Sequence, residues 1–249
     1  MKTKKLIPVL LLLFFMSAYS QSPVDKKNIV KTNLTAYIFR NYNLTYERSL
    51  TSWLSIAVSY GKIPEGEVPL LNKFLKEDDS DYNFNEAKFS NTQITIEPRF
   101  YLGKGYGHGF YLAPYYRQSK VQMDNVVYTL YIDDVDENAV PVTFSGKMTG
   151  NSFGLMLGSQ WFLGKKNNWV LDFWIIGGHY GTSEGNFDGI SDRVLTQDEQ
   201  VQLKESLEDI DLSGAKFETT ITTNNHGGKM ALTGPWAGLR SGLSFGYRF

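Results

Sequence analysis

Hydrophobic and polar residues alternate one by one along much of the chain, most clearly in residues 239–249. One parity holds Leu239, Ser241, Leu243, Phe245, Tyr247 and Phe249, and the other holds Arg240, Gly242, Ser244, Gly246 and Arg248. Because side chains along a strand point alternately to opposite faces, this segment predicts a β-strand with one apolar, aromatic face and one small or cationic face. Such a strand at the end of a chain is typical of a membrane barrel, which leaves no strand edge unpaired in lipid.

Eight segments in all have the character of strands. They are roughly Thr32–Phe39, Tyr42–Leu50, Trp53–Gly61, Thr92–Leu102, Phe110–Arg117, Asn151–Leu163, Trp169–Tyr180 and Leu239–Phe249. Their lengths bracket the ~9–11 residues that a tilted membrane strand needs. The sequence therefore predicts an all-β fold, an eight-stranded antiparallel up-and-down transmembrane β-barrel with long outer loops.

The connections between these segments are of two kinds. Short ones lie at Arg40–Asn41, Thr51–Ser52, Gly103–Gly109 and Gly164–Asn168, and long ones at Lys62–Asn91, Gln118–Gly150 and Gly181–Gly238. Tight turns on one side and long loops on the other are typical of outer-membrane barrels. The up-and-down order places the last three short turns on the side of both termini, and the short first connection is an exception to the pattern.

The long loops are acidic, and the last one is predicted to contain a short helix. Thr196 and Glu199 have the spacing of a capping box, and apolar residues recur at helical spacing at Leu203, Leu207 and Ile210. The acidic stretches are EDDSD (77–81), DDVDEN (133–138) and LEDID (207–211). We expect them to form solvated loop surfaces, and divalent-cation bridging to phosphates of outer-leaflet lipid is the alternative.

The polar parity of the predicted strands carries the charged residues Glu47, Glu97, Arg99, Arg117, Asp172, Arg240 and Arg248. If the apolar parity faces lipid, these charges lie in a narrow lumen filled by side chains, where an isolated charge is costly. We therefore expect ion pairs that close the lumen, with Asp172 close to Arg248 and Glu97 close to Arg117 or Arg99. The alternative is a charged constriction that selects ions in a channel.

A soluble lipocalin-like barrel would show the same alternation with its apolar residues inside. The distribution of lysine favours the membrane barrel, because none of the eight segments contains a lysine whereas the connections hold many. A strand surface that faces water normally uses lysine freely. Tyrosine and tryptophan also occur near the strand ends, where a membrane barrel carries its aromatic girdles.

The N-terminal residues follow the order of a secretory signal, with Lys2, Lys4 and Lys5 before an apolar run and small residues at 17–20. We expect residues 1–20 to be a signal peptide, 21–31 a periplasmic N-terminal segment and 32–249 the outer-membrane barrel domain of a Gram-negative bacterial protein. Removing the signal leaves a mildly acidic chain, which argues against a nucleic-acid partner. The chain has no cysteine, which excludes disulfides and thiol chemistry.

Candidate catalytic residues are few. His179 is expected at the outer end of the seventh strand on the lipid-facing parity, and Ser183 follows four residues later. Because four residues of strand span ~13 Å, the two are a weak nucleophile–base pair for the hydrolysis or transfer of lipid acyl chains. No metal site and no cofactor is expected.

The first predicted hairpin resembles a family of bacterial outer-membrane β-barrels of unknown function, the small eight-stranded type. The resemblance rests on Asn33, on Asn41–Tyr42 and on the triplet Tyr46–Glu47–Arg48. The end of the chain resembles the C-terminal signal read by the barrel-assembly machinery, and the residues concerned are Phe245, Tyr247 and Phe249. The resemblance implies an outer-membrane barrel and carries no catalytic residues.

These features lead us to expect a structural or interactive role at the outer membrane, in envelope integrity or surface contact. A lipid-modifying enzyme at the outer leaflet and a small-solute channel are the alternatives. The expected partners are membrane lipid, lipopolysaccharide and the barrel-assembly machinery, and the chain is expected to be a monomer.

Overall fold

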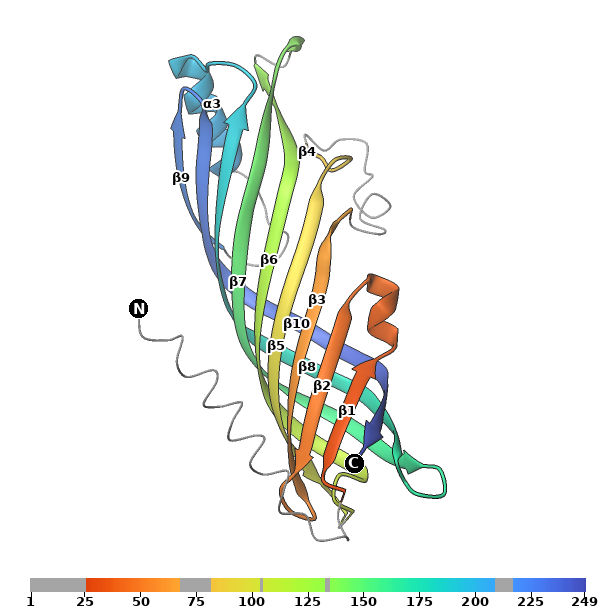
Figure 1. Cartoon of the computed structure of the whole chain (residues 1–249). Coiled ribbons are helices and arrows are strands. Elements are labelled where there is room, and N and C mark those ends of the chain that lie inside the picture. The colour runs from red at the N-terminus through yellow and green to blue at the C-terminus, as the bar shows by residue number, and fades with distance from the viewer. Residues whose placement is uncertain (1–25, 68–81, 104, 133–134, 209–216) are drawn as a thin grey trace, which may run out of the picture.

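The chain folds into one large antiparallel sheet whose strands close into a ring, as the computed structural model shows for residues 26–67, 82–103, 105–132, 135–208 and 217–249 (Figure 1). The ring consists of β1 (Asn28–Asn33), β2 (Tyr42–Ser49), β3 (Leu54–Gly66), β5 (Lys88–Tyr101), β6 (Gly109–Ile132), β7 (Val135–Leu163), β8 (Trp169–Ser191) and β10 (Gly227–Arg248). Each strand pairs with the next, and β10 pairs back with β1 from Ile29↔Arg248 to Asn33↔Ser244. The predicted eight-stranded up-and-down barrel is confirmed.

Two short strands lie outside the ring. The strand β4 (Tyr82–Asn83) pairs with β6, and β9 (Glu218–Asn224) pairs with the first part of β10. The C terminus lies at the same end of the ring as the turns β2–β3, β5–β6 and β7–β8 (Figure 1). We call this end the turn end and the opposite end the open end.

The first strand lies earlier in the chain than the alternation predicted. The expected strand Thr32–Phe39 is in fact β1, Asn28–Asn33, followed by the 3-10 helix η2 (Thr35–Phe39). The reason is local: the side-chain oxygen of Asn33 accepts hydrogen bonds from the Ala36 amide (3.1 Å) and the Thr35 hydroxyl (2.6 Å). An asparagine bonded to the backbone that follows it favours a turn over continued pairing. The barrel therefore begins inside the expected periplasmic segment 21–31, and η2 replaces the expected tight hairpin.

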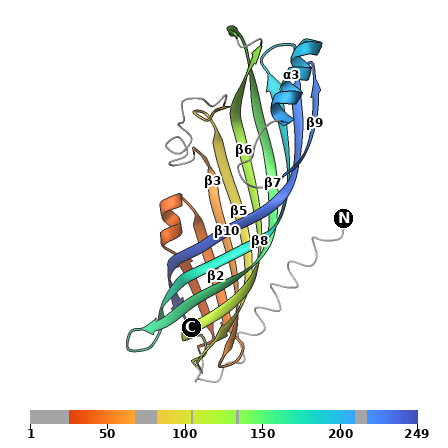
Figure 2. The same ribbon diagram turned by 180° about the vertical axis from the view of Figure 1, so that it is seen from behind.

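The predicted long loops are largely continuous strand. The strands β6, β7, β8 and β10 have 24, 29, 23 and 22 residues, and they rise far above the β1–β2 hairpin at the open end (Figures 1 and 2). Alternation continues through them, for example at Val140, Val142 and Phe144, which are all buried. The acidic stretch at 77–81 and the segment expected as a signal peptide lie outside the described residues, as do residues 133–134 and 209–211 of the other two acidic stretches.

The predicted helix is present as α3 (Gln197–Glu208), and it packs on the upper part of the sheet beside β9 (Figure 1). The capping box is formed, because the Glu199 amide donates to the Thr196 hydroxyl (3.3 Å) and the Thr196 amide donates to the Glu199 carboxylate (2.8 Å). Hydrogen bonds from Arg193, with those from Thr196, lower the pKa of Glu199 to about 2. Predicted helix residue Ile210 lies outside the described residues.

The upper sheet and α3 form a hydrophobic core of their own. Its buried residues are Tyr128, Leu130, Val140, Val142, Phe144, Leu195, Leu203, Leu207 and Ile221. The sheet residues of this core lie on the face that continues the barrel lumen, so α3 covers the inner face of the extension. Much of the chain expected to form the long loops at Gln118–Gly150 and Gly181–Gly238 is therefore a packed unit, which we call the outer sheet.

A β-bulge in β8 changes which of its side chains face the lumen. Leu157 of β7 pairs with Ile176 and the next residue, Gly158, pairs with Trp174, so Ile175 has no partner of its own. The same step occurs against β10, where Arg240 pairs with Gly177 and Gly242 with Trp174. Since an extra residue reverses the alternation beyond it, Ile175 and Ile176 both face outward and every later residue of β8 changes side.

The lower half of the barrel is apolar outside and polar inside. Exposed apolar residues form a belt that includes Leu44, Ile56, Val58, Ile94, Ile96, Leu112, Phe153, Leu155, Leu157, Phe173, Ile175 and Leu239. Phe153 is 73% exposed, whereas Glu97 is 0% and Arg240 6% exposed. The interior is therefore ionic and the apolar set faces outward, which is the reverse of a lipocalin-like barrel.

The belt has a defined height. On β7 it runs from Phe153 to Leu163, and the ~10 steps between them, at ~3.3 Å each and a tilt of about 40°, span ~25 Å. Aromatic side chains lie at its turn-end edge, where Trp53 stacks on Phe100 and Trp169 on Phe245. Above the belt the outward positions of β7 become polar, beginning with Asn151 and including Lys147.

The observed barrel strands contain lysine, unlike the eight predicted segments. The strand β1 contains Lys31, which is fully buried in the lumen. The other lysines of the ring lie in the parts of the strands toward the open end: Lys62, Lys88, Lys120, Lys147 and Lys229. Within the residues that the structure describes, no helix has the length and apolar character needed to cross a bilayer.

Candidate functional site

A cluster of buried charges crosses the barrel lumen in its lower half. The cluster, which we call the plug, consists of Lys31, Glu47, Glu97, Arg99, Asp172 and Arg240, from the strands β1, β2, β5, β8 and β10. Three are cations and three are carboxylates, and strand alternation points all of them inward. Their side chains are 0–4% exposed, so the plug fills the lumen with ions rather than with water.

Two carboxylates and two cations form the centre of the plug. The Lys31 ammonium lies 2.6 Å from both the Glu47 and the Asp172 carboxylate. The Nη1 atom of Arg99 lies 3.1 Å from Glu47 and 2.8 Å from Asp172, and it contacts the same two oxygens as Lys31. Each cation thus bridges strands on different sides of the ring, and this ties β1, β2, β5 and β8 together across the lumen.

Glu97 links this centre to Arg240. The Nη2 atom of Arg99 lies 2.8 Å from one Glu97 oxygen, and the Nη1 atom of Arg240 lies 2.6 Å from the other. The Arg240 guanidinium lies over the rings of Tyr115 (4.5 Å) and Trp174 (4.6 Å). Since a guanidinium interacts favourably with an aromatic face, these rings stabilise the part of Arg240 that Glu97 does not contact.

Neutral side chains satisfy the remaining carboxylate oxygens. Tyr101 (2.7 Å) and Ser55 (2.5 Å) donate their hydroxyl hydrogens to Glu47, and Tyr111 (2.8 Å) donates to Asp172. Gln160 accepts from Lys31 (2.5 Å) through its side-chain oxygen. Buried ions are tolerated where their charges are paired and their polar atoms are hydrogen-bonded, and the centre formed by Lys31, Glu47, Arg99 and Asp172 meets both conditions.

The structure brings together five of the seven charges expected in the lumen: Glu47, Glu97, Arg99, Asp172 and Arg240. Of the two alternatives expected for Glu97, it contacts Arg99 and not Arg117, which donates to the Thr95 hydroxyl (3.0 Å).

The expected approach of Asp172 to Arg248 does not occur. Ser244 is the residue of β10 that pairs with Asp172, so Arg248 lies four residues, ~13 Å, nearer the turn end. Its guanidinium lies over the Phe162 ring, 4.3 Å from the centroid.

Sequence reasoning missed Lys31, Tyr101, Tyr111 and Gln160. Lys31 lies just before the expected first strand, Thr32–Phe39. Its position on the same strand face as Asn33 was therefore not predicted. The hydroxyls of Tyr101 and Tyr111 donate hydrogen bonds to the two central carboxylates, Glu47 and Asp172. The available signal for Tyr101 was its parity, which it shares with Glu97 and Arg99 of the same strand.

The expected catalytic pair is not assembled. The β8 bulge turns His179 from the expected lipid-facing side to the lumen, where its Nδ1 atom lies 3.1 Å from the Tyr115 hydroxyl. Ser183 is buried on the same face and donates to the Gly234 carbonyl oxygen (3.3 Å). In the described part of the chain, no hydrogen bond joins these two side chains, and no group of three His, Asp or Glu residues could hold a metal ion.

The residues expected to form the assembly signal lie on the strand that closes the ring. Phe245 and Tyr247 are exposed on the belt, where Trp169 contacts both rings at 5.3 and 5.4 Å. The backbone of Phe249 exchanges two hydrogen bonds with Asn28 of β1. Comparisons with known protein families, with curated proteins and with solved structures found no match to this chain.

Proposed function

We propose that this protein is an outer-membrane β-barrel with a closed lumen, which anchors the outer sheet at the cell surface and acts in envelope integrity or surface contact. Residues 1–20 would act as its export signal in a Gram-negative bacterium, as the sequence suggests. Its partners would be membrane lipid, lipopolysaccharide and, during assembly, the barrel-assembly machinery. The observation that carries the proposal is the plug, because it occupies the lumen with side chains from five strands.

The belt supports a membrane location. A ring of exposed apolar side chains ~25 Å high matches the apolar band of outer-membrane barrels, and it is too extensive to face water. The turn end carries short connections and would lie in the periplasm. The open end carries the long strands, whose outward face includes the exposed residues Lys120, Lys147 and Lys229, and would lie outside the cell.

The outer sheet supports a role in contact rather than in transport. It has its own core under α3, so it is a rigid surface beyond the belt rather than a set of loops that gate a pore. Rigid elements that project from a membrane barrel are suited to binding at the cell surface.

Conductance in planar bilayers tests the closed lumen. We expect the purified full-length protein to give no steady current, because the plug leaves no continuous water path. The variant Arg99→Ala removes a large buried side chain from the centre of the plug, and where it inserts it should show brief openings. Steady, large conductance of the wild-type protein would contradict the proposal and support a small-solute channel.

The physiological role is tested in a strain that lacks the gene. We expect increased sensitivity to detergent with an unchanged acyl-chain profile of the outer-membrane lipid. A changed acyl profile, restored by the wild-type gene but not by His179→Ala, would instead support a lipid-modifying enzyme.

A further inference from the structure

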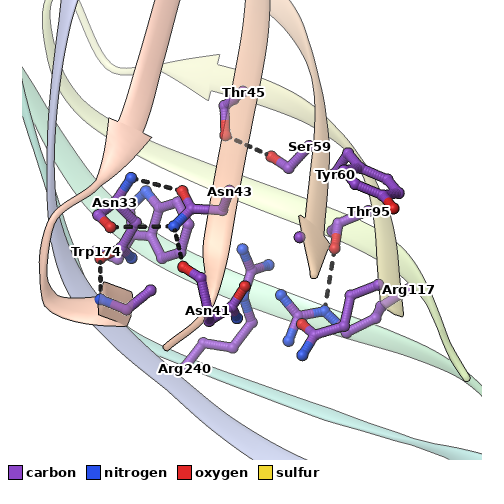
Figure 3. Close-up of a pocket in the computed structure, with 13 residues that line it drawn as sticks. Asn33, Asn41, Asn43, Thr45, Ser59, Tyr60, Thr95, Arg117, Trp174 and Arg240 are labelled. Atoms are coloured by element: carbon purple, nitrogen blue, oxygen red, sulfur yellow. Dashed lines mark hydrogen bonds between the residues drawn. The ribbon is translucent and has the colours of Figure 1, made fainter. Parts of the chain in front are cut away.

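The lumen contains a small cavity of about 50 Å³ on the open-end side of the plug (Figure 3). Its lining includes Arg117 and Arg240, together with Asn41, Gln93 and Thr95. On one side it is bounded by the connection between β1 and β2, where the barrel wall is lowest (Figure 1). A cavity of this volume holds a few water molecules or one small ion.

The charges around the cavity do not balance. In the plug, three cations face three carboxylates. Arg117 adds a fourth cation, and within the described residues it forms no ion pair and one side-chain hydrogen bond, to the neutral Thr95. The lining residues of the cavity include no aspartate and no glutamate. An excess positive charge in a confined lumen is unfavourable unless a counter-charge is bound.

The guanidinium group of Arg240 adds hydrogen-bond donors to the positive charge at this cavity. Arg240 forms an ion pair with Glu97 through Nη1, and none of its three guanidinium nitrogens makes a hydrogen bond to the described residues. Figure 3 shows the guanidinium groups of Arg117 and Arg240 turned into the same cavity, with the side chain of Asn41 beside them. Two guanidinium groups and neighbouring amides are the donor set that binds oxyanions in proteins.

We propose that this cavity, which we call the anion site, binds a single oxyanion group between Arg117 and Arg240. The volume fits one phosphate, sulfate or carboxylate group. The group is either a free inorganic ion or the head of an anionic lipid that enters over the low β1–β2 wall. The bound charge would compensate Arg117 and supply acceptors for the free donors of Arg240.

The first test adds inorganic phosphate to the purified full-length protein in zwitterionic phosphatidylcholine nanodiscs. At constant ionic strength set with chloride, phosphate should raise the urea midpoint of unfolding of the wild-type protein. Arg117→Gln removes the charge-assisted hydrogen bonds to the ion. This variant should therefore need a phosphate concentration about tenfold higher or more for the same rise in the urea midpoint. Lys120→Gln changes an exposed cation on the same strand and should respond as the wild type does.

A second arm distinguishes the two sources of the oxyanion. If the ligand is a lipid head group, phosphate gives no response, and nanodiscs with phosphatidylglycerol raise the midpoint of the wild type and Lys120→Gln but not of Arg117→Gln. In phosphatidylcholine nanodiscs without added phosphate or anionic lipid, Arg117→Gln should be at least as stable as the wild type, since it removes an uncompensated charge. The proposal is overturned if neither phosphate nor anionic lipid stabilises the wild type, or if Arg117→Gln responds equally. These outcomes do not depend on whether the lumen conducts.

Discussion

Replacing Asp172 with asparagine should cost the folded barrel ~3–5 kcal/mol, which is the usual penalty for removing one partner of a buried ion pair. The carboxylate of Asp172 contacts Lys31 and Arg99, and both cations are fully buried. The substitution leaves their charges opposed only by Glu47 and Glu97. Asparagine is nearly isosteric with aspartate, so the expected loss reflects charge and not packing.

Urea unfolding of the purified protein in micelles, followed by tryptophan fluorescence, measures this effect. The matched control is Asp188→Asn, which removes an exposed carboxylate that lies 3.3 Å from Lys229 on the outer sheet. This change should cost less than ~1 kcal/mol, because exposed ion pairs contribute little. The double variant Lys31→Met/Asp172→Asn restores neutrality in the plug and should recover part of the loss. If Asp172→Asn costs no more than Asp188→Asn, the plug does not have the energetic role inferred for it.

Arginine in place of Leu157 should destabilise the barrel in a membrane by ~2–4 kcal/mol. Leu157 is exposed near the middle of the belt on β7, where a charged side chain would lie at the centre of the hydrocarbon. Lumen packing is not changed, because the side chain points away from the barrel axis. The expected effect therefore arises only when lipid surrounds the belt.

Reversible folding into phosphatidylcholine vesicles, titrated with urea, gives the free energy for Leu157→Arg. The control is Thr149→Arg, on the same strand and the same outward face but above the belt, near the exposed Lys147. Near the interface or beyond it an added arginine should cost ~0–1 kcal/mol. Equal effects at the two positions would mean that the belt does not mark the membrane.

The lower half of the barrel could be predicted from the sequence because most strands there have two contrasting faces. On β5, Ile94 and Ile96 alternate with Thr95, Glu97 and Arg99, so a one-residue error in register would turn the charged side chains outward. The same alternation predicts that the side chains of Glu97 and Asp172 point into the lumen. It does not predict which cations they pair with, because the ion pairs depend on how neighbouring strands are staggered, and the sequence of one strand does not specify that stagger.

Three features were beyond the alternation pattern. The start of β1 depends on the side-chain turn at Asn33, which competes with strand pairing only once the backbone is in place. The β8 bulge reverses parity at Ile175, so that His179 was placed on the wrong face. The outer sheet was predicted to be loop because its inner face is apolar, whereas the inner face of the lower strands is polar. Its hydrophobic core also forms only when α3 packs against it.

Site-directed spin labelling along β7 tests the central claim most directly, and the chain has no native cysteine to interfere. Nitroxides placed singly at Leu155, Leu157 and Trp161 in bilayers should be accessible to oxygen and shielded from a water-soluble nickel complex. Labels at Lys147 and Thr149 should show the opposite pattern. If the nickel complex reaches the labels at 155–161 as readily as those at 147 and 149, the belt faces water and the membrane barrel proposed for this chain is contradicted.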